Sequence, residues 1–177
     1  STQGAYESHS EILMNIYLIG MMGSGKSTVG KTLSEKMHKP FIDLDSEIEK
    51  GTGKNISEIF DTDGEEQFRK METKQLKQYS ESIVACGGGI VLKDENREFI
   101  NENGATILLT ASMEELSHRL SDSGNRPLLA DDNTEEALTK LWLERQLHYL
   151  NTADCTIETD GKNPEQLTEE ILVQINP

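Results

Sequence analysis

A short stretch near the N-terminal end of the chain has the residue types and spacing that bind a phosphate group. In the sequence GMMGSGKS, three glycines precede Lys26 and Ser27. The glycines let the backbone curl so that successive N–H groups point inward at an anion. Lys26 can reach the β- and γ-phosphates of ATP, and the Ser27 hydroxyl can ligate Mg²⁺. The stretch predicts a phosphate-binding loop (P-loop). Its expected nucleotide-binding residues are Gly23, Ser24, Gly25, Lys26, Ser27 and Thr28.

The segments on either side of the P-loop support this interpretation. Residues 16–19 are apolar, as in a buried strand, and Val29, Leu33 and Met37 share one face of a helix. A P-loop requires a strand, a glycine-rich turn and a helix in this order. A turn that binds nothing has no need for lysine followed by serine at its end.

Two carboxylates belong to the next predicted strand, residues 41–45. Asp43 and Asp45 stand at its carboxyl end, where ligands collect in open parallel sheets. There they could hold Mg²⁺ or take a proton from an attacking hydroxyl. The alternative is that both are solvated acids capping the next helix.

A second candidate site lies in the helix predicted over residues 64–79. Glu72 falls inside the apolar stripe of this helix, and Arg69 lies at its edge, one turn away. A carboxylate within an apolar stripe needs a partner. The two residues form either part of a ligand site or a plain intrahelical ion pair.

The helix predicted over residues 134–150 carries a similar anomaly. Arg145 lies between Trp142 and Tyr149 on an apolar stripe. Because arginine stays charged, an inward Arg145 must meet an anion, either a buried carboxylate or an acidic ligand. The other side of the helix carries three leucines, which predict burial on two sides; they are Leu143, Leu147 and Leu150.

Two further segments could contact a ligand. Gly87, Gly88 and Gly89 follow a third predicted strand, residues 83–86. They supply either backbone donors or a loop without side chains that would block a ligand. Arg126 lies in a polar loop, residues 121–133, which could close as a lid and bring a cation to a transferring phosphoryl group. The alternative is a solvated loop arginine.

Composition excludes several classes of protein. The chain has 177 residues and a formal net charge of −15, which argues against binding to nucleic acid or an anionic membrane. It has no apolar run long enough for a membrane helix. The two cysteines lack metal-site spacing and fit a reducing, cytoplasmic compartment. Residues 1–13 are interpreted as a flexible leader or tag remnant, and residues 14–177 as a single α/β domain.

These segments together resemble the shikimate kinase family, a nucleoside-monophosphate-kinase-like group of P-loop proteins. The resemblance covers residues 15–175. The matching pieces are GMMGSGKST at 20–28, FIDLD at 41–45, ISEIF at 56–60, GEEQFRKME at 64–72, CGGG at 86–89, RPLL at 126–129, and Arg145 with Tyr149. The resemblance implies a three-layer αβα fold whose five-stranded parallel sheet has the order 2-3-1-4-5. It also implies substrate-binding helices at about 46–79 and a lid at about 121–133.

The resemblance further implies a monomeric, ATP- and Mg²⁺-dependent kinase that phosphorylates the 3-hydroxyl of shikimate, in aromatic amino acid biosynthesis. Lys26, Asp45 and Arg126 would be catalytic, and Ser27 and Asp43 would serve Mg²⁺. Shikimate would be bound by Asp45, Arg69, Glu72, Gly87, Gly88, Gly89 and Arg145. Arg119, Asn163 and Pro164 would flank the adenine.

The sequence differs from the family's pattern at Cys86, and several alternative functions stay open. Cys86 stands where this family commonly has threonine or serine, and it could make the site sensitive to thiol reagents. The rival functions are a gluconate or nucleoside monophosphate kinase and a non-catalytic binding protein of this family. A nucleotide switch is a further alternative. The combination of acids, arginines and lid motif favours shikimate as the acceptor.

Overall fold

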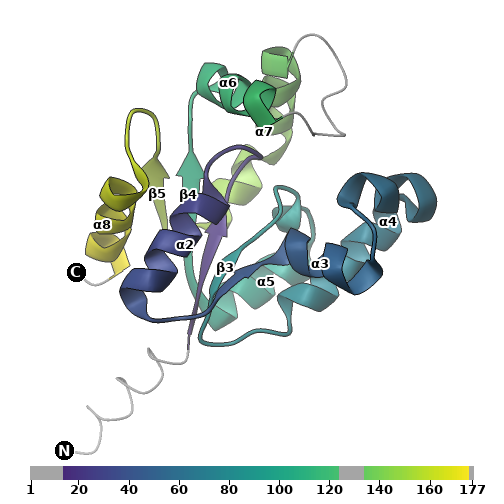
Figure 1. Ribbon diagram of the computed structural model, residues 1–177, viewed down its shortest axis with the longest axis horizontal. Helices are drawn as coiled ribbons and strands as arrows, with labels where there is room; N and C mark the ends of the chain where they lie inside the picture. The colour runs from purple at the N-terminus through teal and green to yellow at the C-terminus, as the bar shows by residue number, and fades with distance from the viewer. Residues whose placement is uncertain (1–13, 124–133, 176–177) are drawn as a thin grey trace, which may run out of the picture.

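A five-stranded parallel sheet forms the centre of the computed structural model, which describes residues 14–123 and 134–175 (Figure 1). Its strands are β1 (Asn15–Ile19), β2 (Phe41–Asp43), β3 (Ile83–Ala85), β4 (Gly104–Thr110) and β5 (Cys155–Glu158). They lie in the order β2-β3-β1-β4-β5, and every neighbouring pair is parallel. The predicted fold class and strand order are therefore confirmed.

Helices connect the strands and cover both faces of the sheet (Figure 1). They are α2 (Lys26–Met37), α3 (Leu44–Thr52), α4 (Ile56–Leu76), α5 (Asp94–Asn103), α6 (Met113–Ser123), α7 (Thr134–Thr152) and α8 (Pro164–Ile175), with a 3₁₀ turn, η1 (Ile90–Leu92). The last helix begins at Pro164, and proline at the first helical position sacrifices no intrahelical hydrogen bond.

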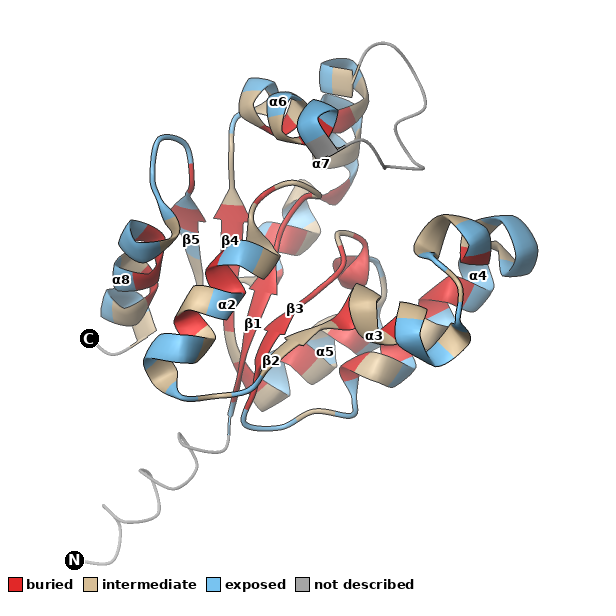
Figure 2. Ribbon diagram, viewed as in Figure 1, coloured by how far each residue is buried: buried red, intermediate tan, exposed pale blue. Residues whose placement is uncertain are grey.

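Alternation along the strands divides the core into two layers. Ile16 and Leu18 of β1 pack in one cluster with α2 and α8, whereas Tyr17 and Ile19 pack in another with α5 and α7. Successive strand residues point to opposite faces, so one buried strand serves both layers. Figure 2 shows the buried residues gathered in the strands and on the inner sides of these helices. The three-layer prediction is confirmed.

The predicted second strand is too long. β2 ends at Asp43, whose side chain accepts a hydrogen bond from the Ser46 N–H and so caps α3. Asp45 therefore lies in the first turn of a helix. The helix predicted over 64–79 is part of a longer element, α4, which begins at Ile56 and has a kink at Gly64 (φ 84°, ψ 163°). This element ends at Leu76.

The prediction that α7 is buried on two sides is wrong. Leu143 is 62% exposed, Leu147 69% and Leu150 49%. The opposite side of α7 is buried, through residues such as Leu138 and Tyr149. A helix that covers one face of a sheet at the molecular surface has a single layer to pack against, so its outer leucines meet solvent.

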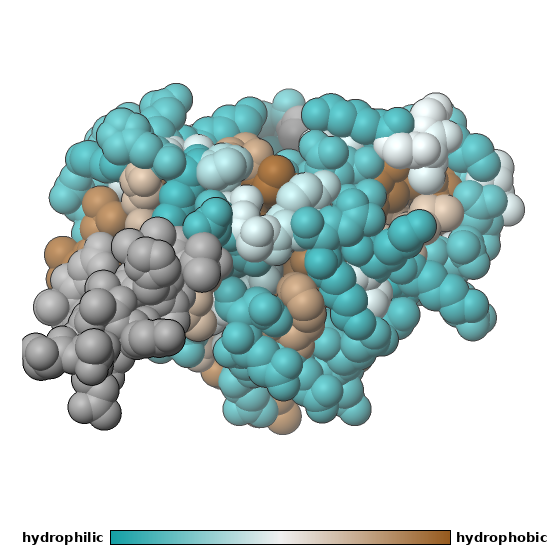
Figure 3. Space-filling model, turned by 90° about the horizontal axis from the view of Figure 1, so that it is seen from below, coloured by the Kyte–Doolittle hydropathy of each residue, from teal (hydrophilic) through white to brown (hydrophobic). Residues whose placement is uncertain are grey.

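The proposed leader, residues 1–13, and most of the proposed lid, residues 124–133, lie outside the described residues. Within the described ranges, no helix combines the length and apolarity needed to cross a membrane. The face of the molecule seen from below is mainly hydrophilic, with apolar residues scattered over it (Figure 3), as the excess of acidic residues predicts.

Candidate active site

The P-loop lies between the end of β1 and the start of α2. Gly23 and Gly25 have φ values of 81° and 97°, which residues with side chains rarely adopt. Their conformation turns the chain into the N-terminus of α2, where backbone N–H groups and the helix dipole favour an anion. Ser24 is 1% exposed, and its buried hydroxyl has no hydrogen-bond partner among the described residues.

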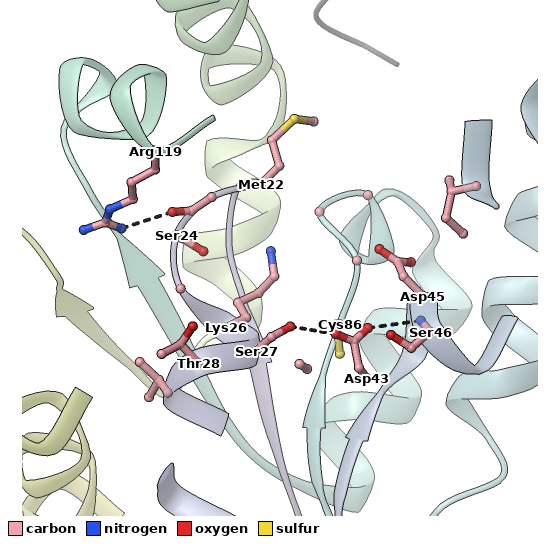
Figure 4. Close-up of a pocket in the computed structure, with 18 of the residues that line it drawn as sticks. Met22, Ser24, Lys26, Ser27, Thr28, Asp43, Asp45, Ser46, Cys86 and Arg119 are labelled. Carbon is pink, nitrogen blue, oxygen red and sulfur yellow. Dashed lines mark hydrogen bonds between the residues drawn. The ribbon is translucent and has the colours of Figure 1, made fainter. Parts of the chain in front are cut away.

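Figure 4 shows Lys26 extending beside this loop and Ser27 directed toward Asp43. Lys26 Nζ donates to the carbonyl oxygens of Gly20 at 2.6 Å and Met21 at 3.1 Å. Ser27 Oγ donates to Asp43 Oδ2 at 2.6 Å. Asp43 thus both caps α3 and faces the P-loop. A hydroxyl and a carboxylate oxygen in contact are the hard oxygen ligands that Mg²⁺ prefers.

Asp45 lies across the pocket from the P-loop lysine (Figure 4). Its Oδ1 is buried and has no hydrogen-bond partner among the described residues. Burial raises the pKa of this carboxyl group, and the charge of Asp43 raises it further. A carboxylate with a raised pKa and a free oxygen is suited to accept a proton from a ligand.

Arg69 and Glu72 form a buried pair in α4. Arg69 Nη1 lies 3.2 Å from Glu72 Oε1, and Arg69 Nη2 lies 3.3 Å from Glu65 Oε1. Glu72 is fully buried, and burial raises its pKa to about 7, although Arg69 opposes the shift. Arg69 and Glu72 therefore form the predicted intrahelical ion pair, and this pair is buried. Arg69 Nε is buried without a partner in the described chain, which leaves a donor for a ligand.

The segment Gly87–Gly89 brings these groups together. A Cβ at Gly87 would lie 2.9 Å from Glu72 Oε2 and 3.0 Å from Asp45 Oδ1, and one at Gly89 would collide with the Arg69 guanidinium. A Cβ at Gly88 would lie 3.3 Å from Arg145 Nη1. A larger residue at these positions would force the ends of side chains from α3, α4 and α7 to shift away from this backbone. The segment is the meeting point of both candidate sites predicted from helix patterns.

Arg145 is buried, with 6% exposure, as its position on the apolar stripe of α7 predicts. It lies beside Tyr149, whose ring stacks on Trp142 with centroids 5.9 Å apart. The Tyr149 hydroxyl donates to the carbonyl oxygen of Gly88. The C-terminal half of α7 thus contacts the glycine segment through two polar side chains.

One pocket of about 710 Å³ joins the P-loop to the glycine segment. Although the chain is strongly acidic, cations gather here, as expected for a site that binds phosphates. The cationic side chains that line the pocket are Lys26, Arg69, Arg119, Arg145 and Lys162. The other predicted site residues that line it are Gly23, Ser24, Gly25, Ser27, Thr28, Asp43, Asp45, Glu72, Gly87, Gly88, Gly89 and Pro164.

Two predicted nucleotide-binding residues, Asn163 and Arg126, are not among these described lining residues. Asn163 is absent from the pocket lining in the described part of the chain; its side chain accepts from the Gln166 N–H and caps α8. Arg126 lies outside the described residues. Arg119 lies beside the P-loop, where its Nη1 donates to the Gly23 carbonyl oxygen and to Thr159 Oγ1, both at 3.1 Å.

Sequence reasoning missed the aromatic wall of the pocket. Phe60 and Phe68 both line it, with ring centroids 4.9 Å apart, and the Arg69 guanidinium lies 5.3 Å from the centre of the Phe68 ring. The non-helical backbone of Gly64 lies between the two residues in α4, so helical spacing alone does not predict that both rings meet at the pocket.

Cys86 also lines the pocket but is 2% exposed. Burial raises the pKa of its thiol far above the ordinary value. The reactive thiolate is therefore disfavoured at neutral pH, which argues against the sensitivity to thiol reagents that Cys86 could bring.

Comparison with known proteins places this architecture in a family. The family model for shikimate kinase matches residues 22–176. A curated shikimate kinase from Persephonella marina (strain DSM 14350 / EX-H1) is 42% identical over 166 residues, which cover 92% of this chain and 99% of that protein.

Solved structures agree with the sequence comparison. Shikimate kinase from Acinetobacter baumannii in complex with shikimate superposes with a TM-score of 0.89 at 38% identity, covering 95% of this chain and 96% of that one. A gluconokinase from Sinorhizobium meliloti 1021 reaches a TM-score of only 0.52 at 16% identity, a likeness of fold alone. With its fold, its P-loop and its matched length, the chain belongs to the shikimate kinase family.

Proposed function

We propose that this protein is an ATP-dependent kinase that transfers the γ-phosphoryl group of ATP to the 3-hydroxyl of shikimate and so produces shikimate 3-phosphate for aromatic amino acid biosynthesis. One observation carries the proposal. The partnerless Asp45 carboxylate oxygen lies beside a glycine segment flanked by Arg69 and Arg145, in the same pocket as a P-loop. The names of the relatives support shikimate as the acceptor.

The acceptor end of the pocket suits a small hydroxy acid. Arg69 and Arg145 approach the glycine segment from different helices, and together they can clamp a carboxylate. The Phe60 and Phe68 rings offer an apolar wall to a carbon ring. Asp45 would then face a ring hydroxyl, while Glu72 holds Arg69 in place.

The donor end suits a nucleoside triphosphate. Backbone N–H groups from Gly23 to Thr28 would bind the phosphates, and Lys26 would leave its contacts with the loop carbonyls to reach them. Arg119 and the Asn163–Pro164 segment would border the adenine, and Arg126 would approach the phosphates from the lid. These roles follow the family resemblance.

Ser27 and Asp43 would hold Mg²⁺, because their side-chain oxygens already lie in contact beside the P-loop. When bound, the ion would neutralise charge on the phosphates. Side chains of the protein would activate the acceptor and stabilise the transferred group. Asp45 would orient the shikimate hydroxyl and accept its proton. The hydroxyl oxygen would form a bond to the γ-phosphorus while the bond from that phosphorus to the ADP oxygen breaks, with the two oxygens in line. Lys26 and Arg126 would stabilise the developing negative charge.

The described residues of one chain line both ends of the pocket, which supports a monomer; size-exclusion chromatography with light scattering should give about 19.8 kDa. A cytoplasmic location is consistent with two free cysteines.

ATP consumption measured in parallel with shikimate, gluconate and nucleoside monophosphates tests the acceptor. We expect turnover with shikimate to exceed turnover with the others by at least about a hundredfold, because two arginines and a base select a compact hydroxy acid. Preference for gluconate or a nucleoside monophosphate would support a related kinase instead. Absence of turnover by folded protein with Mg²⁺ would support a binding protein or nucleotide switch.

A further inference from the structure

The glycine segment forms a β-turn whose central peptide has two available orientations. The Ile90 N–H donates to the Gly87 carbonyl oxygen at 3.1 Å, so Gly88 and Gly89 are the central residues of the turn. Gly89 has φ −92° and ψ 8°, the values of a type I turn. A type II turn needs a positive φ at that position, which glycine adopts freely. The sequence therefore permits both turns, which differ by rotation of the Gly88–Gly89 peptide.

A side chain of α7 selects between these orientations. The Tyr149 hydroxyl donates to the Gly88 carbonyl oxygen, which belongs to this peptide. Tyr149 is fully buried, and burial raises the pKa of its hydroxyl, so it keeps the proton that it donates. The carbonyl oxygens of Gly87 and Gly89 accept from the N–H groups of Ile90 and Leu92, at 3.1 Å each. The carbonyl oxygens of all three glycines therefore accept hydrogen bonds.

The Gly89 N–H, which belongs to the same peptide, points in the opposite direction from the Gly88 carbonyl. In a trans peptide the N–H points away from the carbonyl, and the Gly89 N–H has no hydrogen bond within residues 14–123 and 134–175. Gly88 and Gly89 line the pocket, whereas Tyr149 is not among its described lining residues and approaches from the core. Fixing the carbonyl toward Tyr149 therefore directs the Gly89 N–H toward the pocket.

We propose that Tyr149 is a positioning residue: its hydroxyl holds the Gly88–Gly89 peptide in the type I orientation and thereby aims the Gly89 N–H at the acceptor. This inference deepens the proposed function and rests on it. The consequence of losing the hydroxyl is specific. With phenylalanine at 149, the Gly88 carbonyl oxygen would lose the hydroxyl that donates to it. The peptide would then be free to rotate and turn the N–H away from the pocket.

Tyr149→Phe tests the inference, with Tyr17→Phe as its matched control. Tyr17 is also fully buried, and its hydroxyl accepts from Asn15 Nδ2 at 2.9 Å, at the end of β1 away from the P-loop. Both variants lose one buried hydroxyl, so both should lose a similar amount of thermal stability. We expect kcat/KM for shikimate to fall at least about tenfold in Tyr149→Phe alone, with KM for ATP within about twofold of wild type. A crystal structure of the variant should show a positive φ at Gly89.

Three results would overturn the inference: kcat/KM for shikimate unchanged in Tyr149→Phe, an equal fall in Tyr17→Phe, or a type I turn retained in the Tyr149→Phe crystal structure. If Tyr149→Phe does not fold, NMR of the wild-type protein decides, because shikimate should shift the Gly89 amide resonance; an unmoved resonance at saturating shikimate contradicts the inference. Failure of the proposed function looks different, since wild-type protein would then not turn over shikimate at all, while the turn type in the variant would still report on Tyr149.

Discussion

The two ends of the pocket are built in different ways. The P-loop end is a run of consecutive residues that binds through backbone N–H groups, a helix terminus and Lys26. The acceptor end combines side chains from α3, α4 and α7 around one glycine segment, and its buried charged groups are Arg69, Glu72 and Arg145. A contiguous site is specified by local sequence, whereas a dispersed site exists only once the fold has formed. Substitutions at the two ends should therefore affect different substrates.

The largest effect is expected at the donor end. Lys26→Met removes the charge that would stabilise the transferred phosphoryl group, and kcat should fall about a thousandfold. Lys26 is partly exposed, so the fold should persist. Steady-state kinetics and circular dichroism check both parts. Near-normal turnover would refute the role of Lys26.

Asp45→Asn should produce the next largest effect. An amide cannot accept the hydroxyl proton, so kcat should fall about a hundredfold, a typical loss for a general base. KM for ATP should stay within about twofold, because Asp45 belongs to the acceptor end. A parallel rise in both KM values would mean that Asp45 is structural.

Arg145→Ala should distinguish the two ends of the pocket most clearly through ligand affinity. Loss of a buried cation should weaken shikimate binding about a hundredfold and leave ATP binding nearly unchanged. Isothermal titration with each ligand measures both affinities. Equal losses for the two ligands would show that Arg145 only supports the fold.

Gly87→Ala tests the close approach at the glycine segment. The added Cβ would lie 2.9 Å from Glu72 Oε2 and 3.0 Å from Asp45 Oδ1, so these side chains must shift. We expect KM for shikimate to rise about tenfold. Gly51→Ala is the control, because nothing lies within 4 Å of its Cβ position in α3. A similar KM change in the control would contradict the close-approach account.

Glu72→Gln should change turnover least, by about threefold, yet alter the pH dependence of stability. The folded-state pKa of Glu72, about 7, exceeds its ordinary value of 4.5. The native state therefore binds this proton more tightly, and its stabilising contribution disappears as pH rises from 4.5 to 7. Wild type should lose about 3 kcal/mol of unfolding free energy over this range through Glu72, and the variant should not. Urea titrations at several pH values measure the difference; identical slopes would contradict a raised pKa.

Local patterns explain how much could be predicted from the sequence. The P-loop is predictable because glycine spacing and a terminal Lys-Ser pair have few other uses. Inward Arg145 and Glu72 are predictable because a charge inside an apolar stripe is costly without a partner. The end of β2 was misplaced because Asp43 can both finish a strand and cap a helix.

Other features depend on the assembled fold. Leucines at 143, 147 and 150 follow the spacing of a buried face, and only the number of neighbouring layers decides that they are exposed. The contact between Tyr149 and Gly88 joins residues 61 positions apart. Its acceptor is a backbone carbonyl, which the pattern of side chains in the sequence does not reveal. The aromatic wall, Phe60 and Phe68, escaped notice because core and pocket faces of a helix have the same composition.

Phosphorus NMR of a reaction containing the protein, ATP, Mg²⁺ and shikimate tests the central claim most directly, since it identifies the product as well as the loss of ATP. If the P-loop is the donor half of a two-substrate site, ADP and a phosphate monoester of shikimate should appear in equal amounts, with little inorganic phosphate. Inorganic phosphate as the sole product, or unchanged ATP, would contradict phosphoryl transfer to the acceptor end of this pocket.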